Sequence, residues 1–95
     1  MYLGAYHFDG SPDDLTAAYE RLSAQLPPDI TELHVAVVRG GGLTVFDACP
    51  DEETFHGFSQ SPEFLGAVRA SGLPEPRVEP LGGVVRARLR APVGA

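Results

Sequence analysis

The chain has 95 residues, a formal net charge of −6 and 43% hydrophobic residues. This length accommodates one domain, and the composition is too apolar for a disordered chain. An acidic chain with seven arginines and no lysine is poorly suited to binding nucleic acid. No apolar stretch approaches the roughly 20 residues that cross a bilayer, and the N-terminus lacks the features of a signal peptide. Cys49 is the single cysteine, so we expect no internal disulfide and a reducing, cytoplasmic compartment.

The shortage of three residue types reflects the base composition of the genome rather than the function of the protein. Lysine and asparagine are absent, and isoleucine occurs only at Ile30. All three use A/T-rich codons, so their shortage indicates a high-GC bacterial source. We draw no functional conclusion from it.

The first part of the chain predicts a strand followed by a helix. Residues 2–8 (YLGAYHF) are aromatic-rich and uncharged, which favours a strand that Asp9-Gly10 ends. Ser11 is a suitable helix cap, and Pro12 fits the first helical position. We expect Pro27-Pro28 to stop the helix. Between these limits, apolar residues recur at spacings of 4, 3 and 4, which predicts one buried helix face: Leu15, Tyr19, Leu22 and Leu26.

The middle of the chain predicts a hairpin and a second helical region. Residues 32–39 (ELHVAVVR) and 43–48 (LTVFDA) favour two strands, and glycines 40–42 suit the reversal between them. A proline followed by acids at 49–53 is typical of a helix start. A second capping pattern, Ser61-Pro62-Glu63, predicts that the helix restarts or kinks there before it ends at Gly72.

The C-terminal part predicts one more strand. Residues 77–89 are expected to form it, with a bulge or bend at 80–83 where proline and glycines interrupt the pattern. Residues 91–95 are expected to be a frayed tail. The domain therefore spans residues 1–90.

The predicted order of elements is β-α-β-β-α-β, which defines an α+β architecture. Two split βαβ units with right-handed crossovers give a four-stranded antiparallel sheet of order 4-1-3-2, with both helices on one face. This arrangement is the ferredoxin-like plait.

The predicted strands are apolar on both faces, which favours a homodimer. In the second strand, Leu33, Val35 and Val37 lie on one side, while Ala36 and Val38 lie on the other. Helices cover only one face of such a sheet, so the other face needs a different cover. Two copies packed sheet to sheet would form a dimeric α/β barrel. The alternative is a monomer with a mildly apolar open face, an arrangement that is uncommon among soluble monomers.

One part of the chain resembles a known superfamily. The segment Asp47-Ala48-Cys49-Pro50 leads into Phe55, Phe58 and Ser61-Pro62-Glu63-Phe64. Together with the size and element order, this pattern resembles the dimeric α/β barrel superfamily, and within it the antibiotic-biosynthesis-monooxygenase-like group. The resemblance implies a cofactor-free, monooxygenase-like enzyme that acts on an aromatic or polyketide-like small molecule. Haem-degrading members of the superfamily use an asparagine and a tryptophan, and this chain has neither.

A different class of function stays open beside the enzyme. A non-catalytic homodimer that binds a small molecule or assists a partner protein has the same size, charge and expected fold. A deep pocket lined by Tyr6, His7 or His34 would favour the enzyme. A pocket filled by side chains would favour the binding or accessory protein.

The histidines are the first candidates for chemistry. His7 and His34 lie within predicted strands, where a titratable ring occupies a position that otherwise suits an apolar side chain. Either could remove a proton from a phenol or enol, or each could be a core histidine bonded to a carbonyl. His56, on the second helix, is expected to face solvent. We expect a cavity between sheet and helices, with His34 and His7 ahead of Tyr6 as its polar lining.

Other residues are weaker candidates. Asp47, inside the third strand, could orient His7 or pair with an arginine of the last strand. Tyr6 could hold a substrate oxygen, although strand tyrosines often only pack. Cys49 precedes a helix start, but Asp47 and Asp51 oppose its thiolate. No histidine and carboxylate spacing predicts a metal site, and no cofactor is expected.

The C-terminal arginines form a separate pattern. Arg86, Arg88 and Arg90 alternate along the predicted last strand and would share one of its faces. They could prevent aberrant edge pairing, contact the acidic half of a partner subunit, or meet an anionic ligand. The first two roles are favoured.

Overall fold

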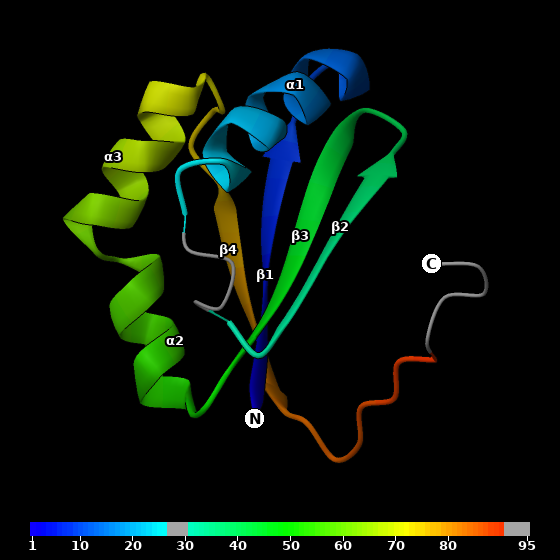
Figure 1. Cartoon of the computed structure of the whole chain (residues 1–95), viewed down its shortest axis with the longest axis vertical. Helices are drawn as coiled ribbons and strands as arrows, with labels where there is room; N and C mark the ends of the chain where they lie inside the picture. The colour runs from blue at the N-terminus through cyan, green and yellow to red at the C-terminus, as the bar shows by residue number, and fades with distance from the viewer. Residues whose placement is uncertain (27–30, 91–95) are drawn as a thin grey trace.

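The computed structural model describes residues 1–26 and 31–90, and Figure 1 shows how their elements are arranged. The expected stop at Pro27-Pro28 and the expected tail at 91–95 lie outside these residues. The element order is β-α-β-β-α-α-β, and the class is α+β. The elements are β1 (Tyr2–Asp9), α1 (Pro12–Ser23), β2 (Leu33–Arg39), β3 (Gly42–Cys49), α2 (Glu52–Ser59), α3 (Pro62–Ser71) and β4 (Arg77–Gly83).

The four strands form one antiparallel sheet of order β2-β3-β1-β4. The predicted order 4-1-3-2 is this order counted from the other edge, so that prediction is confirmed. Gly40 and Gly41 close the tight hairpin between β2 and β3, and Gly41 has a φ of 77°, which favours glycine. The register places His34 of β2 and Gly4 of β1 on either side of Asp47 in β3.

The helices cover one face of the sheet, and the hydrophobic core lies between them. Strand residues alternate between the faces. Tyr6 and Phe8 of β1, and Leu43 and Val45 of β3, therefore face the helices and are buried. The helices complete this core with Leu15, Ala18, Leu22, Phe55, Phe64 and Val68.

The second helical region consists of two helices, so the structure has three helices where two were expected. Asp51 caps α2 by accepting a hydrogen bond from the Thr54 amide at 2.7 Å. Ser61 caps α3 in the same way, with the Phe64 amide at 3.1 Å. The predicted restart at Ser61 is confirmed. α1, the longest helix, has 12 residues, and no helix in the described residues is long and apolar enough to span a membrane.

The last strand is shorter than the sequence predicted. β4 ends at Gly83, and residues 85–90 belong to no strand of the sheet. The expectation that residues 77–89 form one strand, with Arg86, Arg88 and Arg90 on one of its faces, is therefore wrong. The predicted irregularity is present, because the β1–β4 register shifts between Leu3 and Gly4. Proline and two glycines in this stretch disturb regular pairing.

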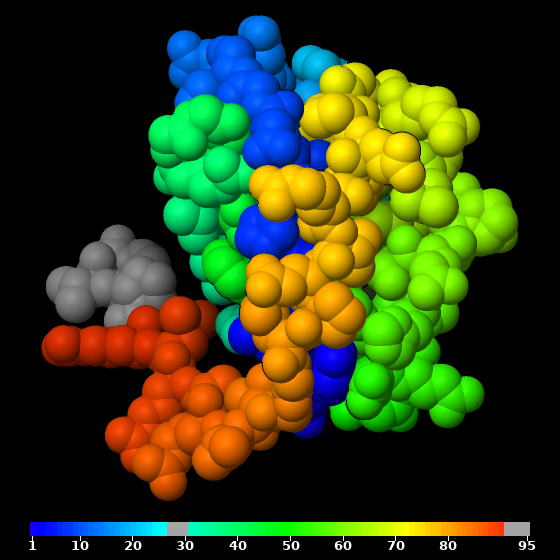
Figure 2. All heavy atoms as spheres, turned by 180° about the vertical axis from the view of Figure 1, so that it is seen from behind, coloured from blue at the N-terminus to red at the C-terminus, as the bar shows by residue number. Residues whose placement is uncertain are grey.

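The other face of the sheet has no helix over it. Figure 2 shows β1 side chains between those of β4 and the β2–β3 hairpin, with no helix in front of them. Val35 and Val37 point to this side and are 41% and 42% exposed. The uncovered face is thus partly apolar, as the strand pattern predicted.

Candidate functional site

A cavity of about 250 Å³ lies between the sheet and the helices. Its walls are mainly apolar, and the polar side chains come from β1, α1, β2 and β3 and from Thr31 just before β2. Such a lining, with few polar groups, is typical of small-molecule sites. The lining residues are Tyr6, Phe8, Tyr19, Leu22, Ser23, Leu26, Thr31, His34, Val45, Asp47, Phe58 and Phe64.

His34 and Asp47 form a hydrogen-bonded pair in this cavity. They are directly opposite in the β2–β3 register, and His34 Nδ1 lies 2.5 Å from Asp47 Oδ1. The Asp47 side chain is only 7% exposed, whereas the His34 side chain is 41% exposed. A carboxylate only accepts hydrogen bonds, so Nδ1 carries a proton and Nε2 of the neutral ring is an acceptor. The pair therefore resembles an oriented general base.

Tyr19 of α1 completes a chain of three side chains. Its hydroxyl lies 2.6 Å from His34 Nε2, and the two rings are stacked with centroids 5.8 Å apart and planes at 12°. The hydroxyl donates to Nε2, because the ring proton is on Nδ1, where it is donated to Asp47. The atom of His34 that would accept a proton is thus the atom that Tyr19 occupies.

The electrostatics of the chain favour a histidine that titrates above its usual range. The hydrogen bond to Asp47 raises the pKa of His34, against an opposing effect of burial, and the Asp47 charge adds to the rise. Burial raises the pKa of the Tyr19 hydroxyl. Tyr19 is therefore a neutral donor near neutral pH, while His34 is a proton acceptor of increased strength.

Tyr6, which also lines this cavity, has a buried hydroxyl without a partner among the described residues. The residue is 1% exposed. Burial, followed by the charges of Asp47 and Cys49, raises the pKa of Tyr6. The hydroxyl thus stays protonated and can donate to a bound oxygen. Buried polar groups without a partner are uncommon in native proteins.

The position of Tyr6 depends on aromatic packing. Its ring centroid lies 5.8 Å from that of Phe55 and 5.2 Å from that of Phe64. Phe55 in turn fits against Gly4, where an added Cβ would lie 2.0 Å from the ring. The missing side chain at position 4 therefore makes room for the ring that supports Tyr6.

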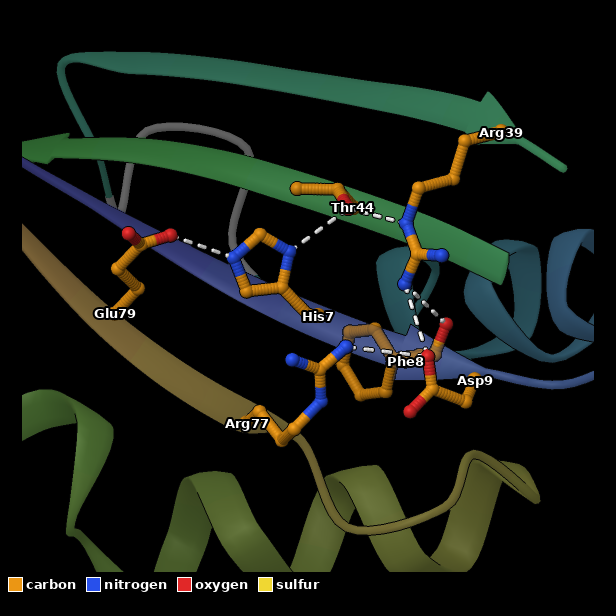
Figure 3. Close-up of polar contacts among 7 residues, drawn as sticks. All are labelled: His7, Phe8, Asp9, Arg39, Thr44, Arg77 and Glu79. Atoms are coloured by element: carbon orange, nitrogen blue, oxygen red, sulfur yellow. Dashed lines mark hydrogen bonds and ion pairs between the residues drawn. The ribbon is translucent and has the colours of Figure 1, made fainter. Parts of the chain in front are cut away.

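His7 lies outside this cavity, on the uncovered face of the sheet (Figure 3). Its Nδ1 is 3.0 Å from Thr44 Oγ1, and its Nε2 is 2.8 Å from Glu79 Oε1. The expected ranking of His7 above Tyr6 as cavity lining is wrong. Successive strand residues face opposite ways, and the structure assigns the covered side to Tyr6.

Asp47 makes neither of the two contacts expected for it. It pairs with His34, while Glu79 and Thr44 hold His7. The arginine of β4, Arg77, contacts Asp9 at 3.2 Å instead. Arg39 approaches the same Asp9 oxygen at 3.1 Å. These contacts join the uncovered face into a separate polar network (Figure 3).

Two other candidates lie away from the chemistry. His56 is on the surface of α2, 3.3 Å from Glu52, as expected for a solvent-facing residue. Cys49 is buried, and desolvation followed by the charges of Asp47 and Asp51 raises the pKa of its thiol. A raised thiol pKa opposes nucleophilic use.

Tyr19 is a site residue that the sequence identifies only as a phenol donor on the first helix and not as part of the site. The sequence pattern places it in the apolar stripe of the first helix, which otherwise contains leucines. The single hydroxyl in that stripe was the available signal. Within residues 1–26 and 31–90, no group of three or more histidine, cysteine or acidic side chains is arranged to hold a metal ion.

Comparisons with protein-family models, with curated proteins and with solved structures found no match to this chain.

Proposed function

We propose that this protein binds a small, mainly apolar weak acid, such as a phenol or an enol, and removes a proton from it with His34. The observation that carries the proposal is the Asp47–His34 pair at 2.5 Å in a cavity whose lining also includes Tyr6, the residue with the unpartnered buried hydroxyl. A proton acceptor in an apolar space, with a neutral donor on a residue of its wall, suits an acid that becomes an anion.

The proposed step begins with the ligand hydroxyl taking the place of the Tyr19 hydroxyl at His34 Nε2. The proton moves from the ligand to Nε2, and the electron pair of the broken O–H bond stays on the ligand oxygen. Asp47 stabilises the imidazolium through Nδ1–H. Tyr6 supplies a hydrogen bond to the anionic ligand, and its own raised pKa keeps that proton in place.

The ferredoxin-like plait and the resemblance to the monooxygenase-like barrels suggest that deprotonation leads to oxygenation. In cofactor-free oxygenation, the substrate anion supplies the electrons that reduce O₂. A methylene group next to the activated ring becomes a carbonyl, one oxygen atom enters the product, and the other leaves as water. His34 would return the first proton to the reduced oxygen.

A second candidate is a non-catalytic binding protein. The contact that favours it is the 2.6 Å hydrogen bond between Tyr19 and His34, which occupies the atom needed as the base. In this alternative the three side chains only orient a bound ligand, and no proton is lost. The homodimer and a cytoplasmic location belong to both proposals, since they rest on the two-sided apolar sheet and the lone buried thiol.

The experiment that tests the proposal uses 4-nitrophenol, whose absorbance distinguishes phenol from phenolate. Titration with the full chain should increase the phenolate signal at a pH below the pKa of the free dye. His34→Gln should abolish that increase. His7→Gln, the matched variant on the other face, should leave it unchanged. If both variants behave like the wild type, His34 is not the acceptor.

Oxygen consumption separates the two candidates. An enolisable polycyclic ketone such as anthrone, supplied with air and the wild-type protein, should consume O₂ faster than in buffer. His34→Gln should bring the rate to the buffer value. Binding without oxygen consumption would favour the non-catalytic protein.

A further inference from the structure

Residues 84–90 follow β4 and belong to no helix or strand; we call this segment the arm. In Figures 1 and 2 the arm leaves the end of β4 and runs on the side of the molecule where β2 lies, away from α2 and α3. Apart from the Val84 amide, which donates to the Met1 carbonyl at 2.8 Å, none of its backbone groups is hydrogen-bonded within the described residues. Val85 and Leu89 are 98% and 85% exposed.

The arm has the sequence of a strand. Its residues, VVRARLR, place Val85, Ala87 and Leu89 on one side of an extended chain and Arg86, Arg88 and Arg90 on the other. This alternation is what predicted a strand through Leu89. Alternating apolar and charged residues give no stability to a segment whose apolar side chains stay in water. The pattern therefore indicates that the arm pairs with an edge outside its own sheet.

The sheet offers one uninterrupted edge. β2 and β4 are the outer strands, and β4 contains Pro80 and the register shift opposite Leu3 and Gly4. A proline removes a ladder donor, so this edge is poorly suited to pairing. β2 is regular from Leu33 to Arg39 and contains no proline. Val35 and Val37 lie half-exposed along it.

Residues 84–90 are too few both to reach their own β2 and to pair along it. It starts at β4, and β2 lies three strand spacings away, roughly 14 Å. Seven extended residues reach at most about 24 Å, so crossing the sheet uses about four of them. A second copy has no such limit, because its β2 can approach the arm directly.

We propose that two copies of this chain exchange their arms, so that residues 84–90 of each pair with the β2 edge of the other. Val85 and Leu89 then join Val35 and Val37 on the uncovered side of the sheet. One two-fold axis satisfies both arms and both edges, which makes the pair self-complementary. The exchange of arms rests on the homodimer proposed above and specifies which segments hold its two chains together.

Charge supports a second copy as the occupant. The arm carries three arginines and no acid, whereas the remainder of the chain holds all thirteen acids and only four arginines. An arm of one sign that meets a body of the other is attracted to it. Gly82 lies within β4, two residues before the arm, and its φ of 148° favours glycine.

The test combines two variants of the full chain and measures oligomeric state by light scattering. Leu89→Ser weakens the arm, and Val37→Lys weakens the edge. Each should raise the dimer dissociation constant at least about tenfold. Val78→Ser, at a 39% exposed position on β4, is the matched control and should dimerise like the wild type. Circular dichroism checks that every variant is folded, since all three positions are exposed.

Mixing the two variants gives the decisive result. A mixed dimer has one contact between a sound arm and a sound edge, and both substitutions fall in the other contact. Where each substitution alone abolishes its contact, the second one costs nothing more, so the mixed dimer should be tighter than either variant's homodimer. No gain on mixing, with both homodimers abolished, would overturn the exchange. A Leu89→Ser chain that dimerises as tightly as the control would also overturn it while leaving the homodimer intact. A wild-type monomer would remove both.

Discussion

The two faces of the sheet each contain a histidine held by an acid, and they use it differently. On the uncovered face, Thr44 and Glu79 engage both ring nitrogens of His7, and neighbouring arginines share Asp9. On the covered face, Asp47 fixes one nitrogen of His34, and a helix side chain, Tyr19, holds the other. Only the covered face leaves a buried hydroxyl, that of Tyr6, without a partner among the described residues.

The difference separates a structural network from a site. Polar groups that satisfy one another within a sheet contribute to register and rigidity. Groups that lie beside a cavity with unused hydrogen-bonding capacity are available to a ligand. A histidine with an acidic partner therefore stabilises the sheet on the uncovered face, whereas on the covered face the same pair lies beside a cavity where a ligand could reach it.

The largest expected effect is on the covered face at Gly4. Gly4→Ala should destabilise the protein by about 3 kcal/mol or more, because the added Cβ would lie 2.0 Å from the buried Phe55 ring. Denaturant unfolding measures the change. Gly66→Ala is the control, since its Cβ meets nothing within 4 Å on α3, and it should stabilise by about 0.5–1 kcal/mol. Equal effects at the two glycines would contradict the packing argument.

Removing a leucine from the cavity wall should have the next largest effect. Leu22→Ala deletes a 6% exposed side chain from the core and should cost about 2–3 kcal/mol of unfolding free energy. Leu81→Ala, at a 46% exposed position of β4, should cost less than about 0.5 kcal/mol. A Leu22 loss as small as the Leu81 loss would mean that the helix stripe does not face the core.

The two histidines should respond differently to loss of their acids. Asp47→Asn should lower the NMR titration midpoint of His34, because the hydrogen bond and charge of Asp47 raise its pKa. Glu79→Gln, which alters the His7 contact, should leave the His34 midpoint unchanged. A His34 midpoint that is the same in wild type and Asp47→Asn would show that the pair is not coupled.

The raised pKa also fixes a direction for stability. The pKa of folded His34 is above that of the unfolded imidazole, near 6.5. Its contribution is therefore fully present below about pH 6.5 and is lost as pH rises through the folded pKa. The stability advantage of the wild type over Asp47→Asn should shrink over that interval in denaturant unfolding.

The smallest expected effect on stability is at Tyr6. Tyr6→Phe removes a buried hydroxyl that has no partner among the described residues, so the free energy of unfolding should stay the same or increase by up to about 1 kcal/mol. Binding of 4-nitrophenolate should nevertheless weaken. Loss of stability without loss of binding would show that the hydroxyl is a structural group.

The strand and helix pattern was predictable from local residues, and the site was predictable only in part. Alternating apolar residues and helix caps predicted the strands and the restart at Ser61, because both signals act over a few positions. The order of these elements, with the right-handed crossover rule, then predicted the sheet order. Parity alone showed that Tyr6 and His7 face opposite ways. Only the packing of the helices decided which of the two faces them.

Two contacts were not predicted because they depend on how one element is placed against another. The Asp47–His34 pair needs the β2–β3 register, and the Tyr19 contact needs the position of α1 over β2. The last strand ends at Gly83 because a strand continues only where a neighbouring strand is there to pair with it. The alternating pattern of residues 84–89 alone therefore overestimated its length.

The single buried thiol is a built-in reporter of local opening. Cys49 is 3% exposed at the end of β3, next to the start of α2, and each chain has one such group. A thiol reagent can reach it only when this corner opens, so the labelling rate in native buffer measures how often it does so. Since Asp47 lies two residues away in the same strand, the openings recorded are those of the segment that carries the partner of His34. A ligand held by that segment would slow the labelling. The experiment needs no engineered cysteine, because Cys49 is native to the chain.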